Sequence, residues 1–552
     1  MSFAEARNQL NLVFEIKIVD FEERPMCQSC KNPMIVCSHS TPSSVIGFEG
    51  TYYTKYREYT CGDQDCSQYR TKKFRAPNPW RVDRHKYDCE VEAEVTHQRF
   101  EEKKTYREIE KPMKLQYGIM MSQKTIGNII ARYEVTCELE HEQNYSSEFK
   151  KNGGVFIGID AMAPLKGEDK HIVAIDHYTH QTLLVERVRS ENTDAHVAFQ
   201  RNLKKLASQH KIKVLGFMSD DHVAQRKAIQ LVWGSKMKHC RCLFHFQKRI
   251  MLEPFNLNSK LKTKVKARIR KISYVNQLRA GKLNSVENSA VWQYLLEIIT
   301  DLVALQNWKN KRNDTDLESI TFYERLQDIY LLLKALETQL APTSEGTYKV
   351  EKRRLSLLMK EIKAILNDFK QDYEDLKRIK GYQSKLKQIF EAHEESSQVG
   401  LEKLIVFAKE LEARLKAGVV TSDTEKFYIE QLCSFVYDRG ESLFHYRDIK
   451  NANNTNNVQE NKFKTVKHTI RRTQGTATGA RFFQHHAKYM LYIDPNATRE
   501  EIRQILLRAD NKAVAKILRE ERALRKRPLS RIKDKKKWES RKKQLKEKLR
   551  EI

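Results

Sequence analysis

The stretch "GGVFIGIDAM", residues 153–162, is the first of four short apolar segments that indicate a β-sheet. "HIVAIDH" (171–177) and "TLLVERV" (182–188) follow it closely, and "KVLGFMSDD" (213–221) comes after a helical stretch from Thr193 to His210. Strands joined by short turns form a meander, whereas a strand reached through a helix returns by a right-handed crossover. We therefore expect a mixed sheet in which the fourth strand can lie beside the first.

Two acidic residues stand where apolar strands leave the expected core: Asp160 ends "VFIGID" and Asp220 ends "KVLGFMSD". If these strands are parallel, both carboxylates emerge at one sheet edge, where their mutual repulsion requires a cation. Mg²⁺, or Mn²⁺, suits hard oxygen ligands and phosphate substrates. A single Asp at a strand end is more often a turn or helix-cap residue. Asp221 is the alternative second acid, although we expect its side chain to point to another face.

A third acid, Glu460, lies in "NNTNNVQENKFKTVKHTIRR", residues 453–472. The asparagines are typical of a loop, and Glu460 then stands near the N-terminus of a helix. Spacings of three and four residues place basic side chains on neighbouring faces of that helix: Lys464, Lys467, His468, Arg471 and Arg472. The glutamate can thus reach a metal site while the basic face holds a phosphate backbone. Two metal ions held by such acids support an in-line phosphodiester displacement.

These residues resemble the DDE transposases of insertion-sequence type, whose catalytic core has an RNase H-like fold. The resemblance is carried by Asp160, Asp220 and Glu460, and by "HCRCLFHFQKR" (239–249), where Cys242 and His245 match the family's Cys-x-x-His motif. It covers about 150–250 and 445–490. It implies an enzyme that binds transposon ends and catalyses Mg-dependent strand cleavage and transfer, with Cys242 and His245 supporting the active site. From the residues alone, Cys242 could equally well be an ordinary buried thiol and His245 an imidazole that caps a helix.

Two cysteine pairs near the start of the chain predict a zinc ribbon: Cys27-x-x-Cys30 and Cys61-x4-Cys66. Short knuckles aim two thiolates each at one ion, which is what a tetrahedral structural Zn²⁺ site requires. Cys37 and His39 lie between the pairs and could replace a ligand or belong to a second site. The alternative is that some of these residues are ordinary buried side chains.

The segment 105–135 predicts a helix-turn-helix. Its first helix spans Thr105 to Lys114, a turn follows at Gly118, and Ser122 is the N-cap of the second helix. Ile126, Ile129, Ile130 and Tyr133 form the buried face of that second helix. Its outward residues are of types that read bases and phosphates, namely Gln123, Lys124, Asn128 and Arg132. Any small helical hairpin shares this pattern.

The charge balance favours a polyanionic partner. Lys and Arg number 101 against 72 Asp and Glu, a formal charge of +29 and a pI near 9.5. A lysine-rich surface is the simpler alternative. The resemblance implies double-stranded DNA, both terminal inverted repeats and target, and a homo-oligomer that pairs two ends. It also makes Trp233, Trp292 and Trp308 candidates for base stacking, although tryptophans are more often core residues.

The expected fold class is multidomain α/β: an RNase H-like mixed sheet interrupted by a large all-α insertion and preceded by a zinc-ribbon-like segment and a helix-turn-helix. No apolar run is long enough for a membrane span, so we expect a cytoplasmic, nucleoid-associated protein of a prokaryotic host. The alternatives are a DNA-binding regulator that has no catalytic activity and an RNase H-like nuclease that does not transfer strands. The expected segments are 1–80 (zinc ribbon), 81–148 (helix-turn-helix), 149–250 and 445–500 (catalytic core), 251–444 (insertion) and 501–552 (basic tail).

Overall fold

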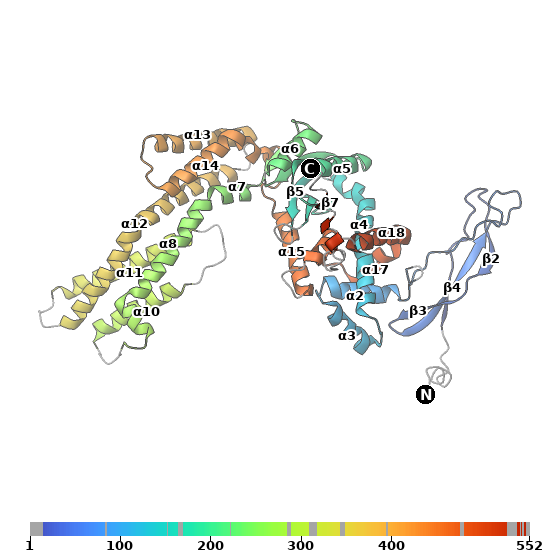
Figure 1. Cartoon of the computed structure of the whole chain (residues 1–552), viewed down its shortest axis with the longest axis horizontal. Helices are drawn as coiled ribbons and strands as arrows, with labels where there is room; N and C mark the ends of the chain where they lie inside the picture. Colours follow the sequence, from blue (N-terminus) through green and yellow to red (C-terminus); the bar gives the residue numbers. More distant parts are fainter. Residues whose placement is uncertain are drawn as a thin grey trace. The chain divides into compact units, whose positions relative to one another are not determined.

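The computed structural model describes residues 15–547 with gaps, and the chain divides into two compact units (Figure 1). Unit 1 comprises 1–217, 222–237 and 457–552, and unit 2 comprises 218–221 and 238–456. Two sheets and many helices confirm the multidomain α/β class. The residues outside the description are 1–14, 83–84, 152, 164–168, 221, 284–288, 309–316, 343–347, 393–395, 475–479, 527–537, 541, 544–545 and 548–552.

The first sheet of unit 1 is built on one long strand, β4 (Gly50–Thr60). It pairs in parallel with β1 (Ile16–Val19) and antiparallel with β2 (Ile35–His39) and β3 (Ser43–Gly47). The alternation of "TYYTKYREYT" explains the strand, because Tyr52, Thr54, Tyr56 and Glu58 are buried while the residues between them face outward more.

The second sheet has the strand order β7-β6-β5-β8-β9. Its strands are β5 (Val155–Met162), β6 (Lys170–Asp176), β7 (Thr182–Val188), β8 (Val214–Ser219) and β9 (His239–Arg241). β5, β6 and β7 form an antiparallel meander, and β8 returns through helix α5 (Thr193–Gln209) to lie beside β5. The predicted meander and crossover are confirmed.

The strands β5 and β8 start side by side, because the Val155 N–H donates to the Lys213 carbonyl oxygen at 2.8 Å. Gly154 makes this approach possible, since a Cβ there would lie 2.4 Å from the same oxygen. Two strands that begin together run in the same direction. One detail of the prediction is wrong: Asp160 does not end its strand, because β5 continues through Ala161 to Met162.

A single hydrophobic core joins the sheet of β5–β7 to the helices around it. The helices are α2 (Cys89–Phe100), α3 (Tyr106–Tyr117), α4 (Gln123–Lys151), α15 (Asn457–Gln474), α16 (Ala480–Met490) and α17 (Arg499–Arg508). Ile126 and Ile130 of α4 share this core with Val173 of β6, Val466 of α15 and Leu506 of α17. The expected helix-turn-helix and the start of the expected tail are therefore parts of the same packed body as the sheet.

Unit 2 is almost entirely helical, and the expected insertion 251–444 lies inside it. Its long helices α8 (Leu252–Lys271), α11 (Glu318–Leu340) and α12 (Lys349–Glu391) pack side by side (Figure 1). The remaining helices are α7 (Leu243–Ile250), α9 (Ser273–Arg279), α10 (Ala290–Asn307), α13 (Ser397–Lys416) and α14 (Asp423–Arg439). Within the described residues of the chain, no helix is long and apolar enough to cross a membrane.

A buried histidine in the sheet predicts acid sensitivity. His171 of β6 is 1% exposed, and burial, followed by the charges of Arg187 and Lys488, lowers its pKa from 6.5 to about 4. Between these two pH values the unfolded chain binds a proton that the folded chain does not, so this contribution to stability is lost as pH falls from 6.5 towards 4. We expect the destabilisation caused by His171→Gln to be smaller at pH 5 than at pH 7 in urea unfolding. An equal destabilisation at both pH values contradicts this assignment.

Candidate active site and nucleic-acid interface

Asp160 sits on the central strand β5, opposite Val173 of β6 in the antiparallel register. Its side chain is half-buried, and its Oδ1 accepts a hydrogen bond of 2.6 Å from the Ala161 N–H. The flanking residues Ile159 and Met162 are fully buried. The strand therefore holds the carboxylate in a fixed position. A catalytic or metal-binding group requires such a position.

The helix that carries Glu460 is fastened to the same place. Glu460 lies in the first turn of α15, which packs against β5. Its neighbour Gln459 is fully buried and donates a hydrogen bond from Nε2 to the Val173 carbonyl oxygen at 2.8 Å. Because Val173 is the register partner of Asp160, this bond brings the turn containing Glu460 next to the strand pair that carries Asp160. The loop-to-helix transition predicted before Glu460 is confirmed, since α15 begins at Asn457.

A half-buried lysine fixes the same helix at its next turn. Lys462 donates from Nζ to the carbonyl oxygen of His180 at 3.0 Å and to Oγ1 of Thr182 at 2.9 Å. Burial lowers the pKa of this lysine to about 8. Gln459 and Lys462 fasten the helix of Glu460 to the sheet. The sequence pattern did not single them out, because a polar residue beside a motif does not show which side of the helix will be buried.

Asp220 follows the last residue of β8 directly and is half-buried. Its predecessor Ser219 is buried, and its Oγ lies 2.7 Å from Nε2 of His239. The alternative acid Asp221 lies outside the described residues.

Cys242 is a buried support for the loop that leads into α15. It stands at the N-cap of α7, and its own N–H donates to the Ser219 carbonyl oxygen at 2.8 Å. Its Sγ accepts a hydrogen bond from the Asn456 N–H at 3.3 Å, and the Leu243 N–H donates to the Asn454 carbonyl oxygen at 3.0 Å. His245 lies on α7, half-buried, with its ring packed edge-on against Phe244 at 5.6 Å between ring centres. The thiol therefore positions the asparagine-rich loop, in line with a supporting role.

The four cysteines predicted as zinc ligands come together in the part of the chain that contains the sheet of β1–β4, residues 15–80, which we call the first sheet module. Sγ of Cys27 lies 3.8 Å from Sγ of Cys66, and Sγ of Cys30 lies 3.6 Å from Sγ of Cys61. Four sulfurs at about 2.3 Å from a central zinc are roughly 3.8 Å apart, so the spacing fits a tetrahedral Zn²⁺ site. Among the described residues, these four form the only group of three or more metal-ligating side chains within 4.8 Å of one another.

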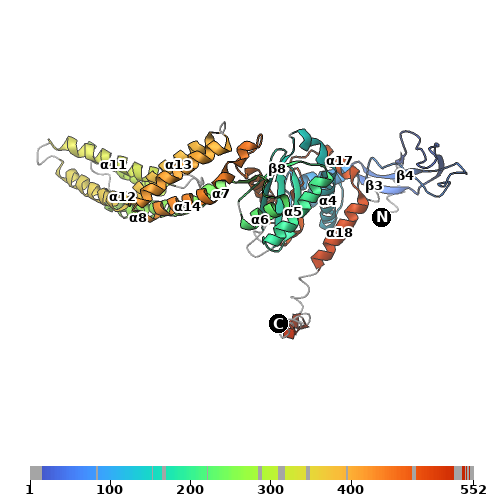
Figure 2. The same ribbon diagram turned by 90° about the horizontal axis from the view of Figure 1, so that it is seen from above.

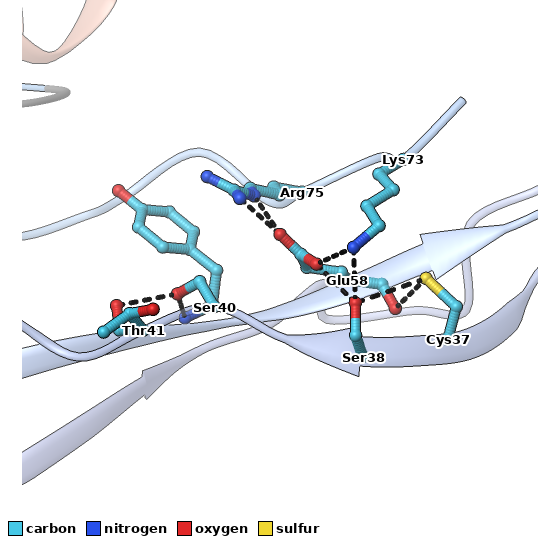
Figure 3. Close-up of polar contacts among 8 residues, drawn as sticks. Cys37, Ser38, Ser40, Thr41, Glu58, Lys73 and Arg75 are labelled. Carbon is cyan, nitrogen blue, oxygen red and sulfur yellow. Dashed lines mark hydrogen bonds and ion pairs between the residues drawn. The ribbon is translucent and has the colours of Figure 1, made fainter. Parts of the chain in front are cut away.

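Cys37 and His39 lie outside this cluster, on the edge strand β2. Cys37 is exposed, and its Sγ donates to the Glu58 carbonyl oxygen at 3.4 Å. Beside it, the buried Glu58 carboxylate accepts from Lys73 Nζ at 2.8 Å, from Arg75 Nε at 2.8 Å and from the Ser38 hydroxyl (Figure 3). These bonds, that of Lys73 foremost, lower the pKa of Glu58 to about 2. The residues between the cysteine pairs thus fasten β2 to β4 and to the segment that follows β4.

Two helices joined by a turn form where the helix-turn-helix was predicted, although the first ends at Tyr117 and not at Lys114. Thr105 and Glu108 make a reciprocal capping box at the start of α3, and Gly118 ends that helix with φ +64°. The Ser122 hydroxyl accepts from the Thr125 N–H at 3.2 Å and caps α4. The predicted buried face of α4 is confirmed, because each of its four residues is at most 1% exposed, namely Ile126, Ile129, Ile130 and Tyr133.

The outward residues of α4 differ in their surroundings. Gln123, Lys124 and Asn128 are exposed. Nε2 of Gln123 donates to Glu110 at 3.1 Å. Arg132 is instead turned inward, and its Nη2 lies 2.6 Å from Oε1 of Glu92. Arg132 takes this position because α4 packs against α2. The pattern of residues along α4 gives no information about that neighbour.

We expect Arg132 to stabilise the fold. Glu92 is 1% exposed, so Arg132→Ala leaves a buried carboxylate whose remaining ion-pair partner among the described residues is His85, at 3.3 Å. Removing one partner of a buried pair costs about 3 kcal/mol. Lys124→Ala, at the exposed start of the same helix, is the matched control and should change stability by less than about 0.5 kcal/mol. Urea unfolding of both variants measures the difference, and equal stability would rule out the structural role.

The basic face of α15 is present. Lys464, Arg471 and Arg472 are exposed and Lys467 is half-buried. Arg472 also reaches α3, with its Nη2 3.2 Å from Oε1 of Glu108. Of the three tryptophans, Trp292 is 3% exposed and Trp233 donates from Nε1 to Gln200 at 2.8 Å, so both belong to cores, whereas Trp308 is 36% exposed.

Comparison with known protein families and with curated proteins finds no match for this chain.

Proposed function

We propose that this protein is a DDE-type DNA transposase, which binds transposon ends and catalyses Mg-dependent phosphodiester cleavage and strand transfer. The single observation that carries the proposal is the bond from Gln459 to Val173, the register partner of Asp160. It fastens the first turn of α15, which carries Glu460, to β6 beside Asp160 of β5, although the two acids lie 300 residues apart in the sequence.

The strand order supports an RNase H-like reading of the sheet. An antiparallel meander followed by a crossover strand next to β5 agrees with the mixed sheet expected for that core. From this order we expect the acid that follows β8, Asp220, to belong to the carboxyl edge at which β5 also ends. Asp160, Asp220 and Glu460 are then the three acids of the active site.

The donor set fits Mg²⁺, because carboxylate oxygens are the hard ligands that this ion prefers. When bound, the metal supplies activation of the attacking oxygen and stabilisation of the leaving oxygen. Asp160 and Glu460 would hold it, together with Asp220. Gln459 and Lys462 fix the helix that carries Glu460. The basic face of the same helix would hold the phosphate backbone. In the first sheet module, Cys27, Cys30, Cys61 and Cys66 would hold a structural Zn²⁺.

The test is cleavage and joining of DNA that carries the sequences flanking the gene, with purified protein in Mg²⁺ and in EDTA. We expect nicks at the ends and joining of the free 3′-hydroxyl to a second DNA, both only with the metal. Cleavage without joining favours an RNase H-like nuclease, and specific binding without any cleavage favours a regulator.

Gln459 gives a sharper prediction about the same site. Gln459→Leu keeps the side chain similar in size but removes the bond to Val173, so Glu460 loses its fixed position. We expect strand cleavage to fall, and apparent Mg²⁺ affinity to weaken, by about 10- to 100-fold, as for other residues that orient metal ligands. Gln504→Leu, on the exposed face of α17, is the control and should leave both unchanged. If calorimetry finds the same Mg²⁺ affinity in Gln459→Leu as in the wild-type protein, Gln459 does not have this positioning role.

A further inference from the structure

Helices α5 and α6 (Val223–Trp233) cover one face of the second sheet. Phe199 of α5 and Ile229 of α6 share a core with Ile172 of β6. The next residue of that strand, Val173, belongs instead to the core in which α15 takes part. Because successive side chains of a strand point to opposite faces, α5 and α6 lie across the sheet from α15.

The two helices lie side by side. His196 in the first turns of α5 and His222, the N-cap of α6, have ring centres 6.1 Å apart. Farther along, Nζ of Lys204 donates to the Val232 carbonyl oxygen at 2.7 Å. Figure 1 and Figure 2 both show α5 and α6 next to each other. Their outward sides therefore form one continuous surface.

This outward side is basic. Residues 193–237 contain eight Lys or Arg against three Asp or Glu. One of these acids, Asp194, lies in the first turn of α5, and the other two precede α6, so the carboxylates lie at one end of the pair. The cations that the two helices carry form what we call the α5–α6 surface: Arg201, Lys204, Lys205, Arg226 and Lys227. All of them are exposed except Arg226, which is half-buried.

No neighbouring carboxylate neutralises the α5–α6 surface. Within the described part of the chain, none of its five cations forms an ion pair. On α12, by contrast, Lys370, Lys377 and Lys387 each lie within 3.8 Å of a glutamate oxygen. Neighbouring cations without counter-charges repel one another, and a polyanion relieves this repulsion. The surface therefore fits a polyanionic partner.

The backbone of duplex DNA matches the spacing of these cations. Arg201 and Lys205 are about one helical turn apart, roughly 6 Å along α5. Packed helices lie about 8–10 Å from each other, so the cations of α6 form a second row beside those of α5. Several of them can thus meet phosphates of one duplex. Contacts of Lys and Arg with phosphates fix position but do not read sequence, which suits a duplex of no fixed sequence.

We infer that the α5–α6 surface holds the target duplex to which the free 3′-hydroxyl end is joined. The inference rests on the proposed function, in which α4 and α15 hold the transposon end. The core of α15 lies on the other face of the sheet, so the two duplexes have separate binding surfaces. α6 begins three residues after Asp220, so a duplex on this surface extends towards the proposed acids.

The joining step needs no further reactant. The attacking 3′-hydroxyl oxygen forms a bond to a target phosphorus, and the bond from that phosphorus to the 3′-oxygen of the target strand breaks. The proton of the attacking hydroxyl is passed to the oxygen that leaves. The α5–α6 surface takes no part in these bonds and serves to position the target phosphate.

The test is the joining of an end duplex to a second duplex that lacks the end sequences. Arg201→Gln/Lys205→Gln/Lys227→Gln should lower joining at least tenfold. For binding of the second duplex, the slope of log K against log salt should fall by about 0.9 for each phosphate that the variant no longer neutralises. Binding and cleavage of the end duplex should stay as in the wild-type protein.

The control, Lys334→Gln/Lys360→Gln/Lys363→Gln, removes the same charge from exposed positions of α11 and α12 and should leave joining unchanged. Joining by the α5–α6 variant that equals that of the control overturns the inference. An equal loss of end-duplex binding also overturns it, because the surface then serves the transposon end. If the wild-type protein neither cleaves nor joins ends, the proposed function fails as well; if it joins and the variant joins equally well, only this inference fails.

A second measurement leaves every charge of the surface in place. A photo-crosslinking residue at Gln230, which is exposed on α6 three residues after Lys227, should label the target duplex. The same residue at Lys124, in a separate protein, should label the end duplex. If residue 230 labels only the end duplex, or no DNA during active joining, the α5–α6 surface does not hold the target.

Discussion

Replacing Asp160 by alanine should abolish strand cleavage and joining while leaving the fold and the binding of DNA intact. Asp160 is half-buried on β5, so its loss would remove one proposed metal ligand without emptying a core position. Loss of a group that stabilises charge in the transition state lowers the rate by roughly 10³-fold, and loss of a ligand to the metal itself should reach at least that value. Glu460→Ala should behave in the same way.

The matched control is Asp169→Asn, a carboxylate just before β6 that pairs with Arg187 at 2.8 Å on the surface. It should keep full activity, because an exposed ion pair contributes little to stability. Thermal unfolding and band-shift binding are measured for every variant, so that a misfolded protein is not mistaken for an inactive one. If Asp160→Ala cleaves as well as the wild type, the proposed active site is wrong.

Removing the metal from the four-cysteine cluster should unfold the first sheet module. The core around the cysteines is small: Cys27, Met34, Tyr59 and Cys61 are its buried members. The second cluster of the module adds only Val19, Tyr56 and Ala76. Zinc bound at structural sites of this kind supplies about 10–16 kcal/mol in isolated peptides, which so small a core cannot replace. We expect Cys61→Ser to lose the zinc and to make the segment up to residue 80 sensitive to protease.

Cys37→Ser is the control for this experiment, because Cys37 lies on β2 of the same module but outside the cluster. It should retain one zinc per chain by elemental analysis, and it should resist protease as the wild type does. A Cys61→Ser protein that keeps its zinc, or wild-type protein that contains none, would exclude the structural zinc site.

Local patterns were enough to predict several features of this protein. The N-cap Ser122 of α4, the apolar face of α4 and the short spacing within each cysteine pair depend on neighbours within a few residues, and the structure forms them where they were expected. The meander and the crossover followed from connection length, because short turns and a helical connection permit few other topologies.

Interactions between distant segments could not be predicted in the same way. Arg132 has the spacing of an outward residue, but α2 approaches α4 and supplies the buried Glu92. The expected basic tail begins with buried Ile502 and Leu506, because α17 packs against α2. Gln459 has no distinguishing neighbour in the sequence, and only the packing of α15 on the sheet turns it towards Val173.

The sequence by itself thus determined the types of the elements, the predicted metal ligands and the acids proposed for catalysis, because periodicity, capping and ligand spacing are local properties of a chain. The tertiary structure decided which of the polar residues serve packing and which face outward. It also brought the turn of Glu460 to the strand pair that carries Asp160. Such pairings depend on how apolar faces hundreds of residues apart bury one another, and no local pattern encodes that choice.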